Sequence, residues 1–480
     1  MYWRKAYQWK LSTLREVSRV VPMPYEFQFI SDDVVPKMVN LANLDTYMET
    51  VKEMNNITHE TEFSMPFVNY KKSKGNFFVD VDGNRVLDLT GNSGLNAVGY
   101  NHKALVPPKG IMKYLSRSPK VTDYPSDEFV DLVRDFVWSS APSGLTEAYF
   151  TEDFGNLANE AAIKLAFLKY MKDHNGLSDV NWDEYADIDL SSISEYLQND
   201  IWVLSFNSSM NSEGFGVESS NDWPTVTLPQ LKYPLSRYEI DNKSEEEKSL
   251  DQIKSIISER LEMGSPVGAI IIEPITALEN VLATPRYYKS LQKIAKENGI
   301  PFIVDETRTG VGSTGKMWAH EFWYLQESPD LVTFGTSAQI SGVFTTPEFR
   351  PYEDRNLASL SHGDLSKIGT FKAITDVIQK KYLLEKTDDT GAYIKAELER
   401  INLEKGIYSH VRGNGTFLGW DLSDSKNMYH MHRYLLRNGI LTSIIGPYTL
   451  GIRPSVTLLP KQAAHLRNVL ASYSPRMQFI

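Results

Sequence analysis

Two acidic residues, Asp305 and Glu306, end an apolar run, FIVDE at 302–306, that is typical of a buried parallel strand. Ligands of open α/β proteins bind beyond the carboxyl ends of such strands. A carboxylate at this position can pair with a cofactor ring nitrogen, coordinate a metal or hold a neighbouring loop. The residues alone do not decide among these three interpretations. The alternative to a functional role is that the carboxylate only pairs with a neighbouring group of the protein.

A second strand of the same type, DLVTF at 330–334, is followed by small and neutral residues. Gly335, Thr336 and Ser337 supply no amine, imidazole or carboxylate. This strand end is therefore expected to face a site without a strong nucleophile or base.

Two further patterns are similar to ligand sites but lack an essential part. The glycine spacing of TGVGSTGKM (309–317) resembles both a dinucleotide-binding turn and a P-loop, but Met317 stands where a P-loop needs a hydroxyl. His430 and His432 are two positions apart on a predicted helix, so they do not face each other. No metal site is expected.

The composition limits the partners and the chemistry of the chain. It has 480 residues, no cysteine and a net charge of −11. The missing cysteines exclude disulfides and thiolate metal ligands, and the acidic balance argues against nucleic acid. No apolar run reaches the roughly 18 residues of a membrane span. Residues 1–21 are basic and amphipathic, which is typical both of a mitochondrial presequence and of an ordinary surface helix.

The elements that must position these residues alternate between helices and strands. The patterns predict a hairpin at 75–91, strands at 148–151, 201–206, 268–275, 302–306, 330–334 and 413–422, and helices at 129–138, 156–172, 244–263, 287–298, 365–385, 388–404, 426–437 and 460–473. A capping box at 244–247 is taken as the start of its helix. We expect an N-terminal arm at 1–66, a larger α/β domain at 67–345 and a smaller α+β domain at 346–480, with the hairpin as a candidate member of the smaller one.

Several stretches, in order along residues 60–470, together resemble the class III pyridoxal-phosphate-dependent aminotransferases, in particular the 4-aminobutyrate aminotransferases. They are GNFFVDVDGNRVLDL, LKYPL, VGAIIIEPI, FIVDETRTGVGSTGKMWAHEFW, FTTPEFRP, VRGNGTF and IRPSV. The resemblance implies the fold of the fold-type-I pyridoxal-phosphate transferases, with a mainly parallel sheet in the larger domain. It also accounts for the glycines of 309–317 as a family segment.

Four positions match functional residues of the resembled family. The resemblance implies that Asp305 contacts the pyridinium nitrogen, that Glu273 is the active-site glutamate and that Arg453 receives a carboxylate. Gly155 matches the cup around the cofactor phosphate.

Six other positions depart from the family pattern. The Schiff-base lysine falls on Ser337, and serine cannot form an imine. The neighbouring lysine of the family falls on Thr336, and the aromatic residue that stacks on the ring falls on Met210. The carboxylate-binding arginine falls on Glu213. The phosphate-cup serine falls on Asn156, and the hydroxyl lent by a partner subunit falls on Leu360.

These departures lead to the expectation of a catalytically inactive aminotransferase-like protein without bound pyridoxal phosphate. Its expected role is that of an accessory subunit of a mitochondrial assembly, such as a respiratory-chain or ATP-synthase complex. The alternatives are a non-catalytic partner of an active aminotransferase paralogue and a residual pyridoxal-phosphate-binding aminotransferase. By resemblance, the chain forms a homodimer or a heterodimer with a paralogue.

Overall fold

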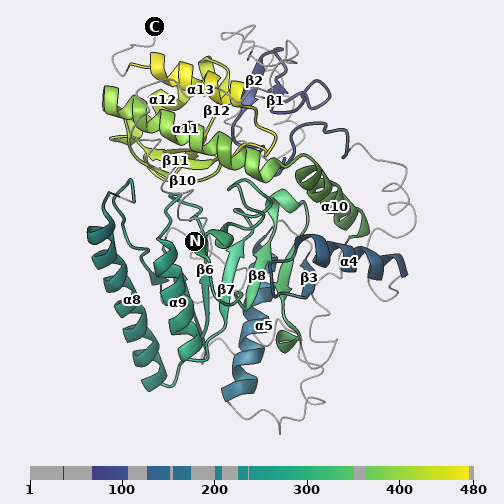
Figure 1. The fold of residues 1–480 in the computed structure, drawn as a ribbon, viewed down its shortest axis with the longest axis vertical. Helices are drawn as coiled ribbons and strands as arrows, with labels where there is room; N and C mark the ends of the chain where they lie inside the picture. The colour runs from purple at the N-terminus through teal and green to yellow at the C-terminus, as the bar shows by residue number, and fades with distance from the viewer. Residues whose placement is uncertain are drawn as a thin grey trace, which may run out of the picture.

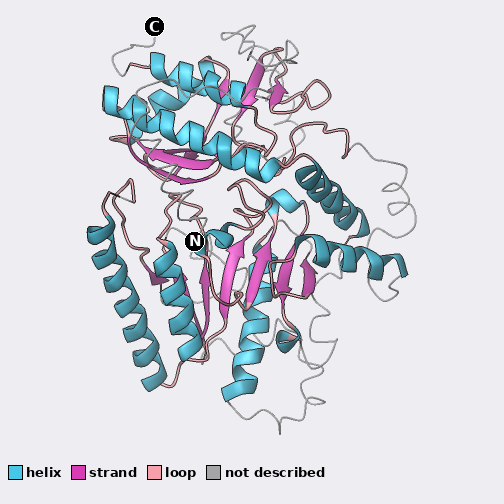
Figure 2. Ribbon diagram, in the orientation of Figure 1, coloured by secondary structure: helices cyan, strands magenta, loops and turns pink. Residues whose placement is uncertain are grey.

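The computed structural model describes residues 36, 67–105, 127–151, 155–174, 201–207, 225–235, 237–350 and 364–474 of the chain. They form a larger domain on a mostly parallel sheet and a smaller domain on an antiparallel sheet (Figure 1, Figure 2). The predicted α/β class is therefore confirmed. Within these residues, no helix is long and apolar enough to cross a membrane.

The larger domain is built on a seven-stranded sheet with the order β3-β9-β8-β7-β6-β4-β5. The strands from β8 to β5 are parallel, whereas β9 is antiparallel to both β8 and β3. Every residue of β6, β7 and β8 is buried, as their unbroken apolar patterns predict. The strands are β3 (Glu147–Thr151), β4 (Trp202–Phe206), β5 (Thr225–Val226), β6 (Val267–Ile272), β7 (Phe302–Glu306), β8 (Leu331–Phe334) and β9 (Ser341–Thr345).

Helices cover this sheet and hold its strand ends in place. α5 packs on β9, β8 and β6, and α8 lies beside α9 (Figure 1). α4 packs on α10, and its Phe136 ring lies 5.3 Å from Phe334 and 4.8 Å from Phe371. This aromatic cluster anchors the carboxyl end of β8. The helices are α4 (Asp127–Ser140), α5 (Asn156–His174), α8 (Glu239–Glu262), α9 (Pro285–Glu297) and α10 (Leu365–Lys380).

The smaller domain has a four-stranded antiparallel sheet with the order β10-β11-β14-β13. Its separate core contains Trp420, Leu398, Met431 and Leu466. The elements are α11 (Leu383–Lys405), β10 (Ser409–Asn414), β11 (Phe417–Asp421), α12 (Ser425–Arg437), β13 (Ser443–Ile445), β14 (Thr449–Ile452) and α13 (Pro460–Ser472).

The predicted N-terminal hairpin is present and contacts the smaller domain. β1 (Phe77–Val79) and β2 (Arg85–Asp88) are antiparallel, and Gly83 occupies a positive φ of 85° between them. β2 also pairs in parallel with β12 (Ile440–Leu441). Leu87 and Leu89 join the core of the smaller domain.

Several element boundaries differ from the sequence prediction: the helix predicted at 365–385 ends at Lys380, the next helix begins at Leu383, and two further differences concern a cap and a hairpin. α8 begins at Glu239, so 244–247 is not a capping box. Glu246 instead is buried and accepts hydrogen bonds from the Thr284 backbone amide and from Arg286. Second, the strand predicted at 413–422 is a hairpin, because β10 and β11 turn at Gly415, which has a positive φ of 51°.

Candidate functional site

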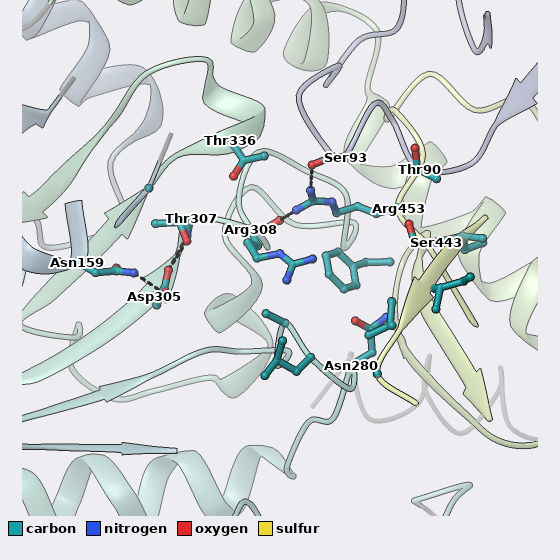
Figure 3. A pocket seen from close by; sticks show the side chains of 18 residues that line it. Thr90, Ser93, Asn159, Asn280, Asp305, Thr307, Arg308, Thr336, Ser443 and Arg453 are labelled. Carbon is teal, nitrogen blue, oxygen red and sulfur yellow. Dashed lines mark hydrogen bonds between the residues drawn. The ribbon is translucent and has the colours of Figure 1, made fainter. Parts of the chain in front are cut away.

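A cavity of about 650 Å³ lies between the carboxyl ends of the large-sheet strands and the antiparallel sheet (Figure 3). We call it the cleft. Residues from both domains line it, which is the usual place for a ligand site in α/β proteins. The lining residues are Thr90, Ser93, Gly155, Asn159, Ala277, Leu278, Asn280, Asp305, Thr307, Arg308, Thr336, Phe417, Ser443, Ile444, Ile445, Gly446, Ile452 and Arg453.

Asp305 is the buried acid at the end of β7, and its carboxylate is held in a fixed orientation. Asn159 Nδ2 donates to Oδ2 at 2.8 Å, and the Thr307 hydroxyl and backbone amide donate to Oδ1 at 2.6 and 2.9 Å. The Thr333 hydroxyl in turn donates to Asn159 Oδ1 at 2.8 Å, which orients the amide. Such a carboxylate is suited to a protonated ring nitrogen.

Arg453 follows β14 and brings a buried positive charge to the cleft. Its Nη1 donates to the backbone oxygen of Arg308 at 2.6 Å, and its Nη2 donates to the backbone oxygen of Ser93. Burial and the charge of Arg308 lower the pKa of Arg453 to about 9. Gly94 makes room for this side chain, because a Cβ at Gly94 would lie 1.7 Å from Nη2.

The structure brings Gly155 to the cleft as well, but it keeps Glu273 out of the lining. Gly155 lies just before α5, and a Cβ there would approach the Thr307 side chain to 3.1 Å. Asn156 is the first residue of α5. Glu273 is buried and accepts a hydrogen bond from the Ala277 amide at 2.6 Å, so it supports the loop after β6.

The end of β8 contributes a short helical turn, η5 (Thr336–Ala338). Thr336 lines the cleft with a positive φ of 37°. Ser337 is buried, and its hydroxyl donates to the backbone oxygen of Gly94 at 2.5 Å. Among the described lining residues there is no lysine.

Some predicted positions lie outside the described residues. They are Met210, Glu213, Leu360 and the expected arm at 1–66, apart from residue 36.

Other acidic and histidine residues serve the fold. Glu306 is buried and accepts hydrogen bonds from the backbone amide of His320 at 2.7 Å and from the hydroxyl of Thr309. His430 and His432 contact the hydroxyls of Tyr473 and Thr442 at 2.8 and 3.1 Å. Within the described part of the chain, no group of three His, Cys, Asp or Glu side chains could hold a metal ion.

Sequence reasoning missed most of the cleft lining, including the polar residues Asn159, Asn280, Thr307 and Arg308. Thr307 and Arg308 directly follow Asp305, so their proximity to a strand end was available as a signal. Asn159 lies one helical turn into α5, and Asn280 lies in the loop after β6. No local pattern marks these two, because only the packing of distant segments brings them to the cleft.

The chain matches one family and several known proteins. A family model for aminotransferase class-III matches residues 58–472. The 4-aminobutyrate aminotransferase of Emericella nidulans is 32% identical over 428 residues, which cover 84% of each protein. The mitochondrial 4-aminobutyrate aminotransferase of Sus scrofa is 29% identical over 442 residues, which cover 88% of this chain and 87% of the relative.

Solved structures have the same fold. A lysine aminotransferase from M. tuberculosis in the internal aldimine form superposes with a TM-score of 0.75 at 21% identity, over 88% of this chain and 98% of that chain. An acetylornithine aminotransferase from Elizabethkingia anophelis gives a TM-score of 0.65 at 17% identity, over 89% and 97%. The predicted fold of pyridoxal-phosphate transferases is therefore confirmed.

The comparisons contradict the expectation of an inactive accessory subunit of a respiratory-chain or ATP-synthase complex. The relatives are named as aminotransferases, which are enzymes. The expectation that no pyridoxal phosphate binds is contradicted too, because class-III aminotransferases are a pyridoxal-phosphate-dependent family. Both expectations depended on single positions such as Ser337, whereas the similarity extends over more than four-fifths of the chain.

Proposed function

This chain belongs to the class-III aminotransferase family, and from that premise we propose that its cleft binds pyridoxal phosphate in an amino-group transfer between an amino acid and an oxo acid. The observation that carries the proposal is the position of Asp305 at the end of β7, buried and fixed by Asn159 and Thr307. A carboxylate there stabilises a protonated pyridinium nitrogen. The names of the relatives suggest 4-aminobutyrate as the amino donor.

The residues of the cleft fit the cofactor through noncovalent contacts. Asp305 would hold the ring nitrogen, and Gly155, which lines the cleft just before the N-terminus of α5, would lie against the phosphate. Ser337 supplies no amine for a covalent link, and its hydroxyl is engaged with Gly94. Bound pyridoxal phosphate would supply the aldehyde that accepts an amino group, and Arg453 would hold a carboxylate of the acid.

The test combines cofactor binding with activity. Purified chain is incubated with pyridoxal phosphate and gel-filtered, and the bound cofactor is measured by its visible absorbance. Amino-group transfer from 4-aminobutyrate to a 2-oxo acid is followed by the amino acid formed. We expect retained cofactor in the wild type and at least about a tenfold weaker affinity in Asp305→Asn, since a charge-assisted hydrogen bond is lost.

The matched control is Asp330→Asn. Asp330 is a half-buried acid that precedes β8 and accepts a hydrogen bond from the Phe302 amide at the opposite end of the sheet. This variant should keep the cofactor. A wild-type chain that retains no pyridoxal phosphate, or that loses it equally in both variants, would contradict the proposal.

We further propose that the chain pairs with a second copy or with an aminotransferase-like paralogue, and that it is mitochondrial. The mitochondrial relatives of mammals support the location. The exposure of Val130 and Trp138 on α4, 52% and 81%, supports an interface there. Light scattering of the purified chain that gives a monomer mass, with no paralogue recovered alongside it, would contradict the pairing.

A further inference from the structure

Arg308 places a second guanidinium in the cleft, next to that of Arg453. It follows Thr307 in the loop after β7 and lines the cavity in a half-buried position. Its side chain extends into the space between Asp305 and Asn280 (Figure 3). The hydrogen bond from Arg453 Nη1 to the Arg308 backbone oxygen, at 2.6 Å, fixes the two residues side by side.

The charges around Arg308 are not balanced within the described residues. The ion pairs found among the described residues engage other arginines, such as Arg286, Arg350 and Arg412, and none of them includes Arg308. Asp305 is the acid among the described lining residues, and its oxygens already accept hydrogen bonds from Asn159 and Thr307. The charge of Arg308 also lowers the pKa of buried Arg453. Two neighbouring cations that face one cavity favour an anionic ligand over an empty site.

We propose that Arg308 is a substrate-binding residue of the cleft and that its guanidinium binds a carboxylate of the amino or oxo acid. The proposal rests on the proposed function for the class of ligand, because aminotransferase substrates are carboxylic acids. The planar guanidinium donates two parallel hydrogen bonds to a carboxylate. Arg453 uses Nη1 and Nη2 for backbone oxygens, so the less engaged Arg308 is the better recognition group. With Arg453 beside it, a compound with two carboxylates balances both charges, whereas a monocarboxylate balances one.

Calorimetric titration of the full chain tests this assignment. The probes are glutarate, butyrate and inorganic phosphate, each with and without saturating pyridoxal phosphate. We expect glutarate to bind more tightly than butyrate or phosphate. Arg308→Gln should weaken glutarate binding by at least about tenfold, the value of one charge-assisted bidentate contact, and should remove the preference over butyrate. Arg308→Lys keeps the charge without the planar fork, so its affinity for glutarate should lie between those of the wild type and Arg308→Gln.

Arg237→Gln is the control for the lost charge. Arg237 is exposed and lies over the Tyr238 ring, away from the cleft. The Arg237→Gln variant should bind all three probes with the affinities of the wild type. Glutarate affinity that is unchanged in Arg308→Gln, or equally reduced in Arg237→Gln, would overturn the assignment. Phosphate binding as tight as glutarate binding, with the same dependence on Arg308, would contradict the carboxylate preference.

The two proposals fail in different ways. Retention of pyridoxal phosphate without Arg308-dependent glutarate binding would leave the proposed function intact and overturn the role of Arg308. Arg308-dependent glutarate binding by a chain that does not retain the cofactor would overturn the proposed function and leave the role of Arg308 intact.

Discussion

At the scale of single residues, Asp421 gives the smaller domain an acid-sensitive contact. Burial alone would raise the pKa of this carboxyl, but hydrogen bonds from His410, Arg412 and Thr449 outweigh burial and lower the pKa below its ordinary 3.8. Arg412 Nη2 lies 2.8 Å from Asp421 Oδ1, and both side chains are largely buried. The ionised carboxylate is therefore the form that the folded state favours.

We predict that Asp421→Asn removes this pH-dependent part of the stability. A carboxyl whose pKa is lower in the folded state stabilises the fold above its unfolded pKa and loses that effect as the pH falls through the folded pKa. At pH 7 the variant should also lose about 3 kcal/mol, because buried Arg412 is left without its partner. Urea unfolding at pH 7, 4 and 3 measures the free energy of unfolding.

The exposed pair of Asp251 and Lys254, 2.9 Å apart, provides the control. Asp251→Asn should change the free energy of unfolding by less than about 0.5 kcal/mol at each pH. If the free energy of unfolding of Asp421→Asn depends on pH as that of the wild type does, the contact between Asp421 and Arg412 is not the source of the acid sensitivity.

At the scale of elements, the N-cap of α10 is the clearest local contact that fixes where a helix begins. Asp364 accepts hydrogen bonds from the backbone amides of Ser366 and Lys367 at 2.8 and 3.3 Å. These amides have no partner within the helix. α10 also packs on α4 and carries Phe371 into the aromatic cluster at the end of β8.

We predict that Asp364→Ala lowers the free energy of unfolding by about 1 kcal/mol, the usual effect of a lost N-cap. Asp364→Asn keeps an acceptor at the same place and should stay within a few tenths of a kcal/mol of the wild type. Thermal and urea unfolding of the two variants measure the difference. Equal loss in both would show that the charge, not the cap, stabilises this end of the helix.

At the scale of the whole molecule, a tight backbone contact fixes the two domains around the cleft. Gly415, in the turn between β10 and β11, has a positive φ of 51°, and a Cβ there would lie 2.3 Å from the Thr314 carbonyl carbon of the larger domain. Next to it, the amide of Thr416 donates to the backbone oxygen of Ser313 at 3.0 Å. An added methyl group would therefore separate the domains.

We predict that Gly415→Ala destabilises the protein by at least about 2 kcal/mol, because strain at positive φ adds to a backbone clash. Gly406→Ala is the matched control: its φ is 61°, but nothing lies within 4 Å of its Cβ position. It should cost only about 1 kcal/mol, the strain of φ. Chemical unfolding measures both, and equal losses would show that the domain contact contributes nothing.

The sequence by itself determined most of the helices, the central strands of the large sheet and the position of one buried acid at a strand end. Unbroken apolar runs identified β6, β7 and β8, and the pattern of residues 75–91 identified the hairpin of β1 and β2, because such patterns act over a few neighbouring positions. Asp305 was found because it ends one of these runs. The start of α8 was missed because Glu246, taken as part of a cap, is buried against Thr284, 38 residues away.

Only the tertiary structure decided which of these residues share the cleft. Arg308 and Arg453 are 145 residues apart, and Ser337 contacts Gly94 across 243 residues. The pairing of β2 with β12 and the antiparallel β9 also join distant segments. Such contacts follow from how strands pair and domains pack, and no local pattern records them. The sequence therefore determined where the acid stands, and the fold determined that two cations face it.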